Sequence, residues 1–188
     1  MRTGKYFRCF VAAWIFPLLT SSLAFAESDF DSKLEEFHEI AVSNEMVMVP
    51  MRDGTTLATN VYYPKNQPGP FPVIFVKTPY LFGPLTENSV GFVLESVKRG
   101  YAYVVQNERG RYYSRGDWEL LGDPAGDGYD SLTWLAEQKW SNGNVGTYGC
   151  SSTAEWQMEL AAKNHPAHKA MIPMAAGAGI GRVGEFYE

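Results

Sequence analysis

The stretch "NVGTYGCSSTAEWQ", residues 144–157, changes from small and β-prone residues to a helical composition at a serine. Its first half predicts a buried strand and its second half predicts the helix that follows. Such a turn can hold one residue in a strained backbone conformation and expose its side chain at the carboxyl edge of a sheet. Ser151 is therefore a candidate nucleophile, and Gly149 is the small residue that the turn requires. Thr153 replaces the second glycine of the G-x-S-x-G pattern, so the short motif alone is weak evidence.

Strands and helices alternate along much of the chain. Asp53 and Gly54 join two β-prone runs within residues 45–64 and predict an antiparallel hairpin. A continuous apolar run over residues 71–80, which Pro79 ends, is typical of a strand buried on both faces. Further strands are predicted at 101–107, 144–149 and 169–177, and helices at 88–100, 126–138 and 151–165. The alternation predicts an α/β fold whose mostly parallel sheet begins with an antiparallel hairpin.

The first 26 residues have the pattern of a secretory signal peptide. They begin with cations, continue through an apolar run and finish on Ala24-Phe25-Ala26, a small-x-small cleavage site. The apolar run is shorter than the ~20 residues that span a bilayer. We therefore expect cleavage after Ala26, a secreted or periplasmic protein and no stable membrane insertion. Residues 27–44 are expected to form an N-terminal arm or short surface helix, and residues 45–188 the domain.

Charge and cysteine content argue against several kinds of partner. The formal net charge is −5, and loss of Arg2, Lys5 and Arg8 with the signal peptide lowers it to −8. We therefore expect no nucleic-acid partner. Cys9 leaves with the same segment, so Cys150 has no partner for an intrachain disulfide, and we interpret it as a small buried residue. The sequence contains no metal-ligand cluster, phosphate loop or cofactor motif, so no cofactor and no metal are predicted.

A longer series of motifs resembles a known family. The segments "VPMRDGTTLATNVYYP", "KTPY", "RGYAYVVQNERGRYYSRGDW" and "DGYDSLTWLAEQKWSNGNVGTYGCS" follow one another in the order and spacing of the X-Pro dipeptidyl-peptidase and cocaine-esterase-like serine hydrolases. The resemblance covers about residues 45 to 180. It implies an α/β-hydrolase fold and the hydrolysis of peptide, ester or amide bonds in a small acyl substrate.

The resemblance also implies roles for individual residues. Ser151 matches the nucleophile, the backbone N–H of Ser152 matches one oxyanion donor, and the hydroxyl of Tyr80 matches the second. Tyr80 follows a predicted strand, so it is expected at the same sheet edge as the elbow. The chain departs from the family pattern at Cys150 and Ser152, where glycine and an aromatic residue are usual. It also departs at Asn107, where aspartate is common.

The residues that would activate the serine are not evident. A serine nucleophile needs a histidine base that a carboxylate orients. His165 is expected about 20 Å from Ser151 along the intervening helix, His168 at the opposite sheet edge, and His38 in the arm. We expect all three to be solvated or capping residues. Five charged residues near the loops are interpreted as structural caps and ion partners: Glu108, Arg109, Arg111, Asp127 and Asp130.

Proteins of the resembled family are several times longer and carry the acid and base in a later portion. We therefore expect this chain to be a fragment that stops after the strand following the elbow, and to be inactive or nearly so alone. Two alternatives remain open. The chain could be a non-catalytic binding or scaffold module of the same fold, or one half of a split enzyme completed by a separately encoded C-terminal half.

Overall fold

A computed structural model describes residues 28–118 and 124–176. The predicted signal peptide and its cleavage site lie outside the described residues, as does the segment from residue 177 onward. Within the two described ranges, no helix is both long and apolar enough to cross a membrane.

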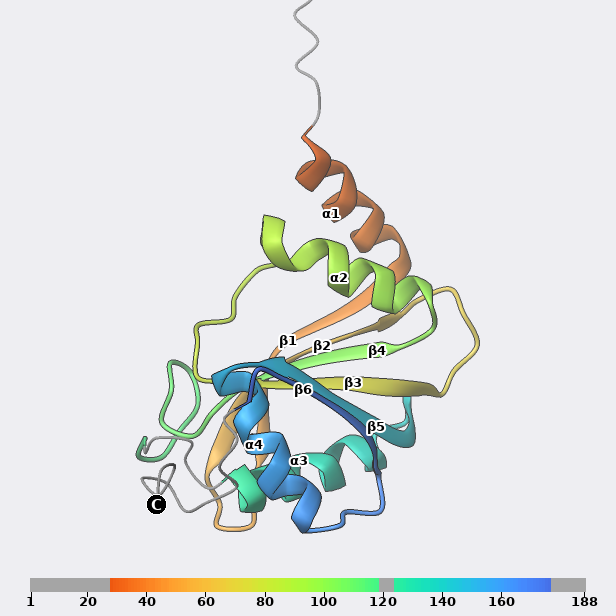
Figure 1. The fold of residues 1–188 in the computed structure, drawn as a ribbon. Coiled ribbons are helices and arrows are strands. Elements are labelled where there is room, and N and C mark those ends of the chain that lie inside the picture. Colours follow the sequence, from red (N-terminus) through yellow and green to blue (C-terminus); the bar gives the residue numbers. More distant parts are fainter. Residues whose placement is uncertain (1–27, 119–123, 177–188) are drawn as a thin grey trace, which may run out of the picture.

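Six strands form one sheet in the order β1-β2-β4-β3-β5-β6 (Figure 1). β1 pairs antiparallel with β2, β2 pairs antiparallel with β4, and the remaining pairs are parallel. The elements are α1 (Asp29–Ile40), β1 (Ala41–Pro50), β2 (Thr56–Pro64), β3 (Phe71–Thr78), α2 (Glu87–Lys98), β4 (Ala102–Asn107), α3 (Pro124–Glu137), β5 (Ser141–Cys150), α4 (Ser152–Ala162) and β6 (His168–Met174). The predicted α/β class and the N-terminal hairpin are confirmed.

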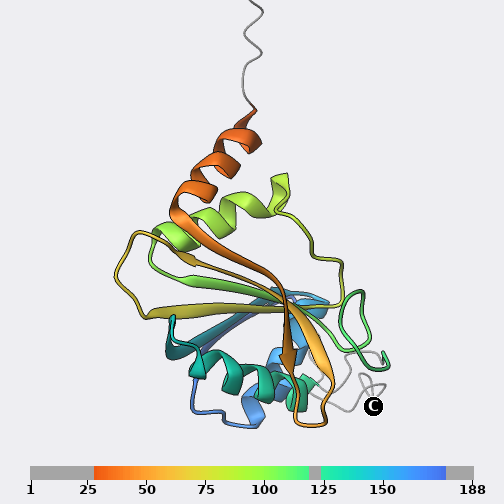
Figure 2. The same ribbon diagram turned by 180° about the vertical axis from the view of Figure 1, so that it is seen from behind.

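Helices cover both faces of the sheet. α1 and α2 lie on one face, and α3 and α4 lie on the other (Figures 1 and 2). On the first face, the ring of Phe37 meets Tyr62 edge-on at 5.4 Å between centroids. On the second face, Phe75 meets Trp156 at 5.5 Å. Burial of each such side chain stabilises the fold by about 2–3 kcal/mol. Because Phe37 belongs to α1 and is 2% exposed, the N-terminal helix is packed onto the domain.

The first strand begins earlier than the sequence indicates. β1 starts at Ala41, inside the segment predicted to be an arm. The sequence pattern does not reveal this start because a β-bulge interrupts the alternation of apolar and polar residues in the strand. The register shifts between Asn44 and Val47, and Met46 between them has a φ of 56°. The side chain of Asn60 on β2 accepts a hydrogen bond from the Met46 N–H at 2.9 Å and so stabilises the bulge.

Three neighbouring parallel strands end at one edge of the sheet. β3 ends at Thr78, β4 at Asn107 and β5 at Cys150, and β3 lies between the other two. Thr78 is paired directly with Asn107. The loops that follow these strands therefore meet at the carboxyl edge, where open α/β sheets bind their ligands.

Candidate active site

Ser151 lies at a sharp turn between β5 and α4. Its backbone has φ 55° and ψ −127°, a region that residues with a Cβ rarely adopt. The Ser151 N–H donates to the carbonyl of Met174 on β6 at 3.0 Å, and its own carbonyl accepts from the Ala154 N–H at 2.7 Å. These bonds hold the strained residue in place with its side chain exposed. The predicted strained elbow is thus present.

Gly149 and Thr153 make the turn possible. A Cβ at Gly149 would overlap the carbonyl group of Thr153 and would lie 2.6 Å from the Thr153 Oγ1. That Oγ1 accepts from the Cys150 N–H and donates to the Cys150 carbonyl, both at 2.7 Å. Thr153, which replaces the second glycine of the short motif, therefore closes the turn with its hydroxyl.

Tyr80 reaches the same turn from the loop that follows the neighbouring strand β3. Its hydroxyl lies 3.4 Å from the Oγ of Ser152, the first residue of α4. An N–H group at that helix position has no acceptor within the helix and lies at the positive end of the helix dipole. The fold therefore brings together the hydroxyl of Tyr80 and the start of α4, next to Ser151.

Cys150 differs from the sequence-based prediction. Its thiol is free and the residue is exposed, whereas we expected a buried filler. The difference arises because Cys150 is the last residue of β5 and lies at the open carboxyl edge, where side chains leave the core.

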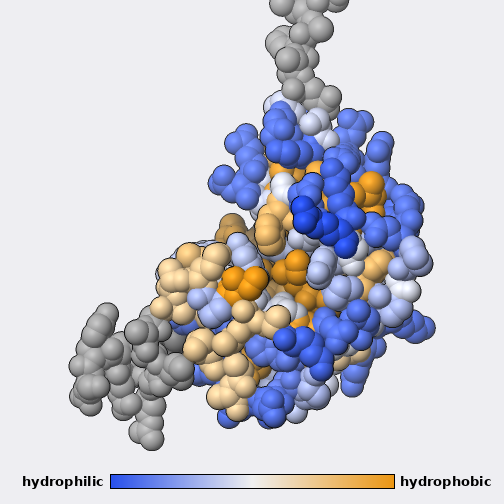
Figure 3. All heavy atoms as spheres, turned by 45° about the vertical axis from the view of Figure 1, so that its right-hand side comes forward, coloured by the Kyte–Doolittle hydropathy of each residue, from blue (hydrophilic) through white to orange (hydrophobic). Residues whose placement is uncertain are grey.

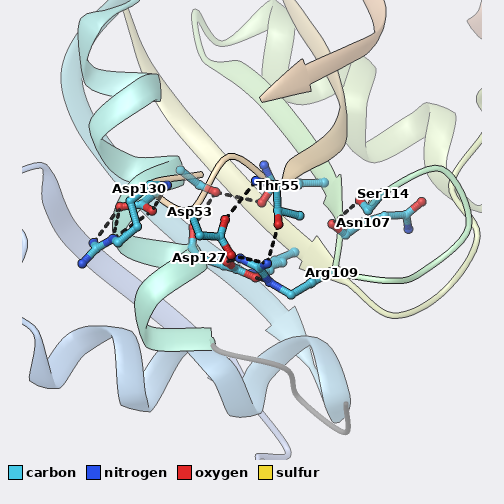
Figure 4. Close-up of polar contacts among 11 residues, drawn as sticks. Asp53, Thr55, Asn107, Arg109, Ser114, Asp127 and Asp130 are labelled. Carbon is cyan, nitrogen blue, oxygen red and sulfur yellow. Dashed lines mark hydrogen bonds and ion pairs between the residues drawn. The ribbon is translucent and has the colours of Figure 1, made fainter. Parts of the chain in front are cut away.

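Arg109 is the centre of a network of ion pairs behind this edge (Figure 4). Its guanidinium donates to both carboxylate oxygens of Asp127 at 2.6 and 3.1 Å, and to Asp53 at 2.7 Å. The hydrogen bond from Arg109 is the main reason that the pKa of Asp53 falls to about 2. Asp127 is buried, and the buried Lys77 lies 3.6 Å from it. This network joins the hairpin turn, the loop after β4 and α3, as expected for structural residues.

A second pair joins the same elements. The guanidinium of Arg52 donates to the Asp130 carboxylate at 2.6 to 3.0 Å, and the Arg52 N–H donates to it at 2.8 Å. Burial would raise the pKa of Asp130, but these bonds together lower it. Arg111 also has a structural contact, because its Nε donates to the carbonyl of Pro79 at 2.9 Å and its guanidinium stacks on Trp118 at 4.8 Å.

Glu108 was expected to be a structural cap or ion partner, but among the described residues it forms no ion pair. Its carboxyl is 2% exposed, and its Oε1 has no hydrogen-bond partner among the described residues. Burial raises its pKa, which the charges of Lys77 and Arg111 partly oppose. Asn107, the residue before it, is fully buried and likewise has an Oδ1 without a partner in the described part of the chain.

None of the three histidines lies at the elbow. The ring of His165 accepts from the Ala167 N–H and contacts Thr133 at 3.0 Å, beyond the far end of α4. His168 begins β6, so it lies at the opposite end of the parallel strands, where its Nε2 contacts Thr147 at 3.0 Å. Burial lowers the pKa of both rings. His38 is exposed on α1. His165 is thus buried and His168 half-buried, so neither is a solvated residue, and the ring of His165 bonds the backbone of the turn before β6.

Comparison with known proteins identifies the family. A family model of X-Pro dipeptidyl-peptidases (S15 family) matches residues 53–183. The chain belongs to this family. The match begins in the hairpin turn and includes the elbow, so the S15 family assignment rests on the same segments that build the site.

Individual relatives agree with the S15 assignment. Cocaine esterase from Rhodococcus sp. (strain MB1 Bresler) is 39% identical over 140 residues, which are 72% of this chain and 24% of the esterase. An aminopeptidase from a marine sediment archaeon, Thaumarchaeota archaeon, superposes with a TM-score of 0.65 at 29% identity and covers 72% of this chain and 25% of its own. A CocE/NonD family hydrolase from Staphylococcus aureus gives 0.64 at 32% identity, covering 72% and 28%. The chain spans about a quarter of the length of these relatives.

The S15 assignment confirms the resemblance and the α/β-hydrolase fold that it implied. The family comprises hydrolases of the esterase and peptidase type. Across residues 28–118 and 124–176, no group of three or more His, Cys, Asp or Glu side chains is arranged to hold a metal ion.

Proposed function

We propose that this chain is the nucleophile-bearing part of an exported serine hydrolase that cleaves acyl bonds in peptides, esters or amides. Ser151 is the nucleophile, and the Tyr80 hydroxyl and the Ser152 backbone N–H are the oxyanion donors. The observation that carries the proposal is the strained backbone of Ser151 beside a tyrosine hydroxyl that lies 3.4 Å from Ser152. An ordinary helix-capping serine needs neither the strain nor the neighbouring phenol.

The chemistry follows from this placement. The Ser151 Oγ attacks the substrate carbonyl and loses its proton to a base, and the carbonyl oxygen becomes an oxyanion. Two donors fixed before the reaction stabilise that charge without reorganising, and one such donor is worth about 10² to 10³ in rate. Collapse of the tetrahedral intermediate expels the amine or alcohol, which takes the proton that the base removed from Ser151. Water, deprotonated by the same base, then hydrolyses the acyl-enzyme, and the proton returns to the Ser151 Oγ.

The general base comes from polypeptide outside these 188 residues. All three histidines of the sequence are accounted for at positions remote from the elbow. Relatives with the same elbow region are about four times longer, which supports a base and acid in an additional segment or in a separately encoded C-terminal half. The 188-residue chain alone is then inactive or nearly so.

β6 supports the proposal of an additional segment. Among the described residues it is the edge strand of the sheet, and it exposes Met171, Ile172 and Met174 by 38%, 54% and 39%. Figure 3 shows apolar surface across the middle of one face of the molecule, with hydrophilic surface above and below it. A strand edge of this kind is suited to pairing with another strand. The exposed apolar side chains of β6 favour a second candidate function, a non-catalytic binding module that takes a partner strand there.

The decisive experiment compares the 188-residue chain with the whole product of its gene. Both are treated with a fluorophosphonate probe and with p-nitrophenyl acetate, and labelled peptides are located by mass spectrometry. We expect the whole product to be labelled at Ser151 and to hydrolyse the ester with a burst, and the chain alone to react at a rate near background. Ser32→Ala is the matched control, because Ser32 is an exposed serine on α1, away from the elbow, and its loss should leave activity unchanged.

Three results would count against the proposal. Ester hydrolysis that survives Ser151→Ala excludes this serine as the nucleophile. Normal burst kinetics of the isolated chain would mean that the base lies within it. A whole gene product that neither hydrolyses nor takes up the probe, even when it is co-expressed with any separately encoded C-terminal half, yet remains monodisperse and stable in sedimentation, would favour the binding module.

A further inference from the structure

The guanidinium of Arg111 is fixed on one side and open on the other. Its Nε donates to the carbonyl of Pro79 at 2.9 Å. Its Cζ lies over the ring of Tyr112, 5.3 Å from the centroid, and over the ring of Trp118 at 4.8 Å. Among the described residues, Nη1 and Nη2 have no hydrogen-bond partner. The guanidinium is therefore held in place with its terminal donors unused.

The loop that carries Arg111 is strained at the next residue. Tyr112 has a φ of 48°, in the left-handed region that residues with a Cβ rarely adopt. Tyr112 is 53% exposed and Trp118 is 45% exposed, so burial of the two rings does not account for this conformation. Strained residues persist where their surroundings hold them, and they are common at ligand clamps. The strain thus points to a role for the loop beyond packing.

Arg111 lies at the same edge of the sheet as the elbow. Pro79, whose carbonyl it bonds, directly precedes Tyr80, and the Tyr80 hydroxyl lies 3.4 Å from the Ser152 Oγ. The loop after β4, which carries Arg111, lies beside the loop after β3, at the end of the sheet where α4 begins (Figures 1 and 2). The fixed cation is thus one residue removed, along the chain, from a proposed oxyanion donor.

The acidic residues near this loop leave Arg111 available. Arg109, two residues earlier, is paired with both Asp127 and Asp53. Arg111 has no such pair within the part of the chain that the structure describes. The charge of Arg111 does act on the buried Glu108, whose pKa burial raises, but the two side chains form no ion pair. The contrast with Arg109 indicates that Arg111 is not a purely structural cation.

We propose that Arg111, with the rings of Tyr112 and Trp118, binds a carboxylate group of the substrate. This inference rests on the proposed function, in which Ser151 attacks an acyl carbonyl at this edge. It narrows the substrate class to peptides, esters or amides that carry a carboxylate. The N–H groups of a guanidinium match the two oxygens of a carboxylate in parallel, charge-assisted hydrogen bonds. Because the rings already hold the guanidinium, little side-chain freedom is lost on binding.

The charge selectivity of the intact gene product tests this role. Two pairs of esters differ in one carboxylate, which a methyl ester replaces in the neutral member. 3-Acetoxybenzoate carries the carboxylate on the leaving group, and the mono-p-nitrophenyl ester of terephthalic acid carries it on the acyl group. Release of the phenol gives kcat/KM for each ester. We expect the charged member to be preferred in one of the pairs.

Arg111→Met should lower that preference about 10- to 100-fold, the factor for a lost hydrogen bond to a charged group. Loss of a merely structural contact would lower kcat/KM for both members of a pair equally. Arg111→Lys keeps the charge without the planar pair of donors and should restore part of the preference. Arg115→Met is the matched control, because Arg115 is an exposed arginine of the same loop, and it should leave the preference unchanged.

Binding can also be followed without turnover. The intact gene product with Ser151→Ala is labelled with 5-fluorotryptophan, and the Trp118 line is the one that disappears in Trp118→Phe. Benzoate should move this fluorine line at concentrations at which benzamide, which has the same shape without the charge, does not. Arg111→Met should abolish the response to benzoate.

Two results would overturn the inference. One is a charge preference that is equal in wild type and Arg111→Met for both ester pairs. The other is a Trp118 line that responds alike to benzoate and benzamide, and this measurement decides if Arg111→Met does not fold. Benzoate binding that depends on Arg111, in a protein that takes up no probe at Ser151, counts against the proposed function alone.

Discussion

Thr153 fills the space that a side chain at Gly149 would need. A Cβ there would overlap the Thr153 carbonyl, and the Thr153 hydroxyl cannot move without releasing its two bonds to Cys150. We expect Gly149→Ala to lower the free energy of unfolding by at least about 2 kcal/mol and to abolish probe labelling of Ser151. Urea denaturation and the labelling assay measure the two effects.

Gly91→Ala is the control for Gly149→Ala. Gly91 lies within α2, and a Cβ at its position would meet nothing within 4 Å. Gly91→Ala should therefore stabilise the protein by about 0.5–1 kcal/mol. A Gly149→Ala protein with wild-type stability would show that the elbow tolerates a side chain two residues before the serine.

The backbone strain at Ser151 should be measurable as a difference in the free energy of unfolding between two variants. Glycine adopts positive φ without the steric penalty that a Cβ brings, which is about 1–2 kcal/mol. Ser151→Gly should thus raise the free energy of unfolding by about 1 kcal/mol relative to Ser151→Ala, and both variants should lose the burst. Equal stability of the two variants would mean that the turn does not strain this residue.

The buried carboxyl of Glu108 should make stability depend on pH. Because burial raises its pKa in the folded protein above 4.5, the carboxyl favours folding in acid and opposes it as pH rises through the folded-state pKa. Glu108→Gln removes this dependence. The difference in unfolding free energy, variant minus wild type, should therefore increase as pH rises from about 4.5. A difference that is flat or that decreases with pH would show that Glu108 is ionised without penalty.

Arg109→Met should leave a buried carboxylate poorly compensated. Asp127 would lose its bidentate partner and keep, among the described residues, the ion pair with Lys77. Loss of the Arg109 pair should lower the free energy of unfolding by about 3 kcal/mol. The pKa of Asp53 should rise from about 2 toward 3.8, as NMR titration would detect. Arg99→Met is the control, because its exposed pair with Glu95 is worth under about 1 kcal/mol. An unchanged pKa of Asp53 would contradict the role assigned to Arg109.

Much of the fold follows from hydrophobic patterning. The apolar run ending at Pro79 gave β3, and the change of composition at Ser151 gave β5 and α4. The early starts of β1 and β5 were missed for related reasons. Met46 and Gly143 have positive φ, and polar residues around them break the period of two that identifies a strand.

The sequence predicts which residues lie at the site, but it does not predict the hydrogen bonds that hold them in place. Strand ends place Ser151 and Tyr80 at one sheet edge, which the chain order alone indicates. The hydrogen bond from Asn107 to the Tyr80 carbonyl depends on the path of two loops, and no pattern in the sequence specifies it. The exposure of Cys150 was misjudged because composition does not reveal where a strand leaves the core.

That exposed thiol gives the protein an intrinsic attachment point. Cys150 is bonded to the backbone of the nucleophile itself, and the sequence has a second cysteine only in its first ten residues. A maleimide fluorophore would therefore attach beside Ser151 without any engineered substitution. Its emission would report the arrival of a substrate, or the docking of the additional segment proposed above, at the moment either one displaces water from the elbow.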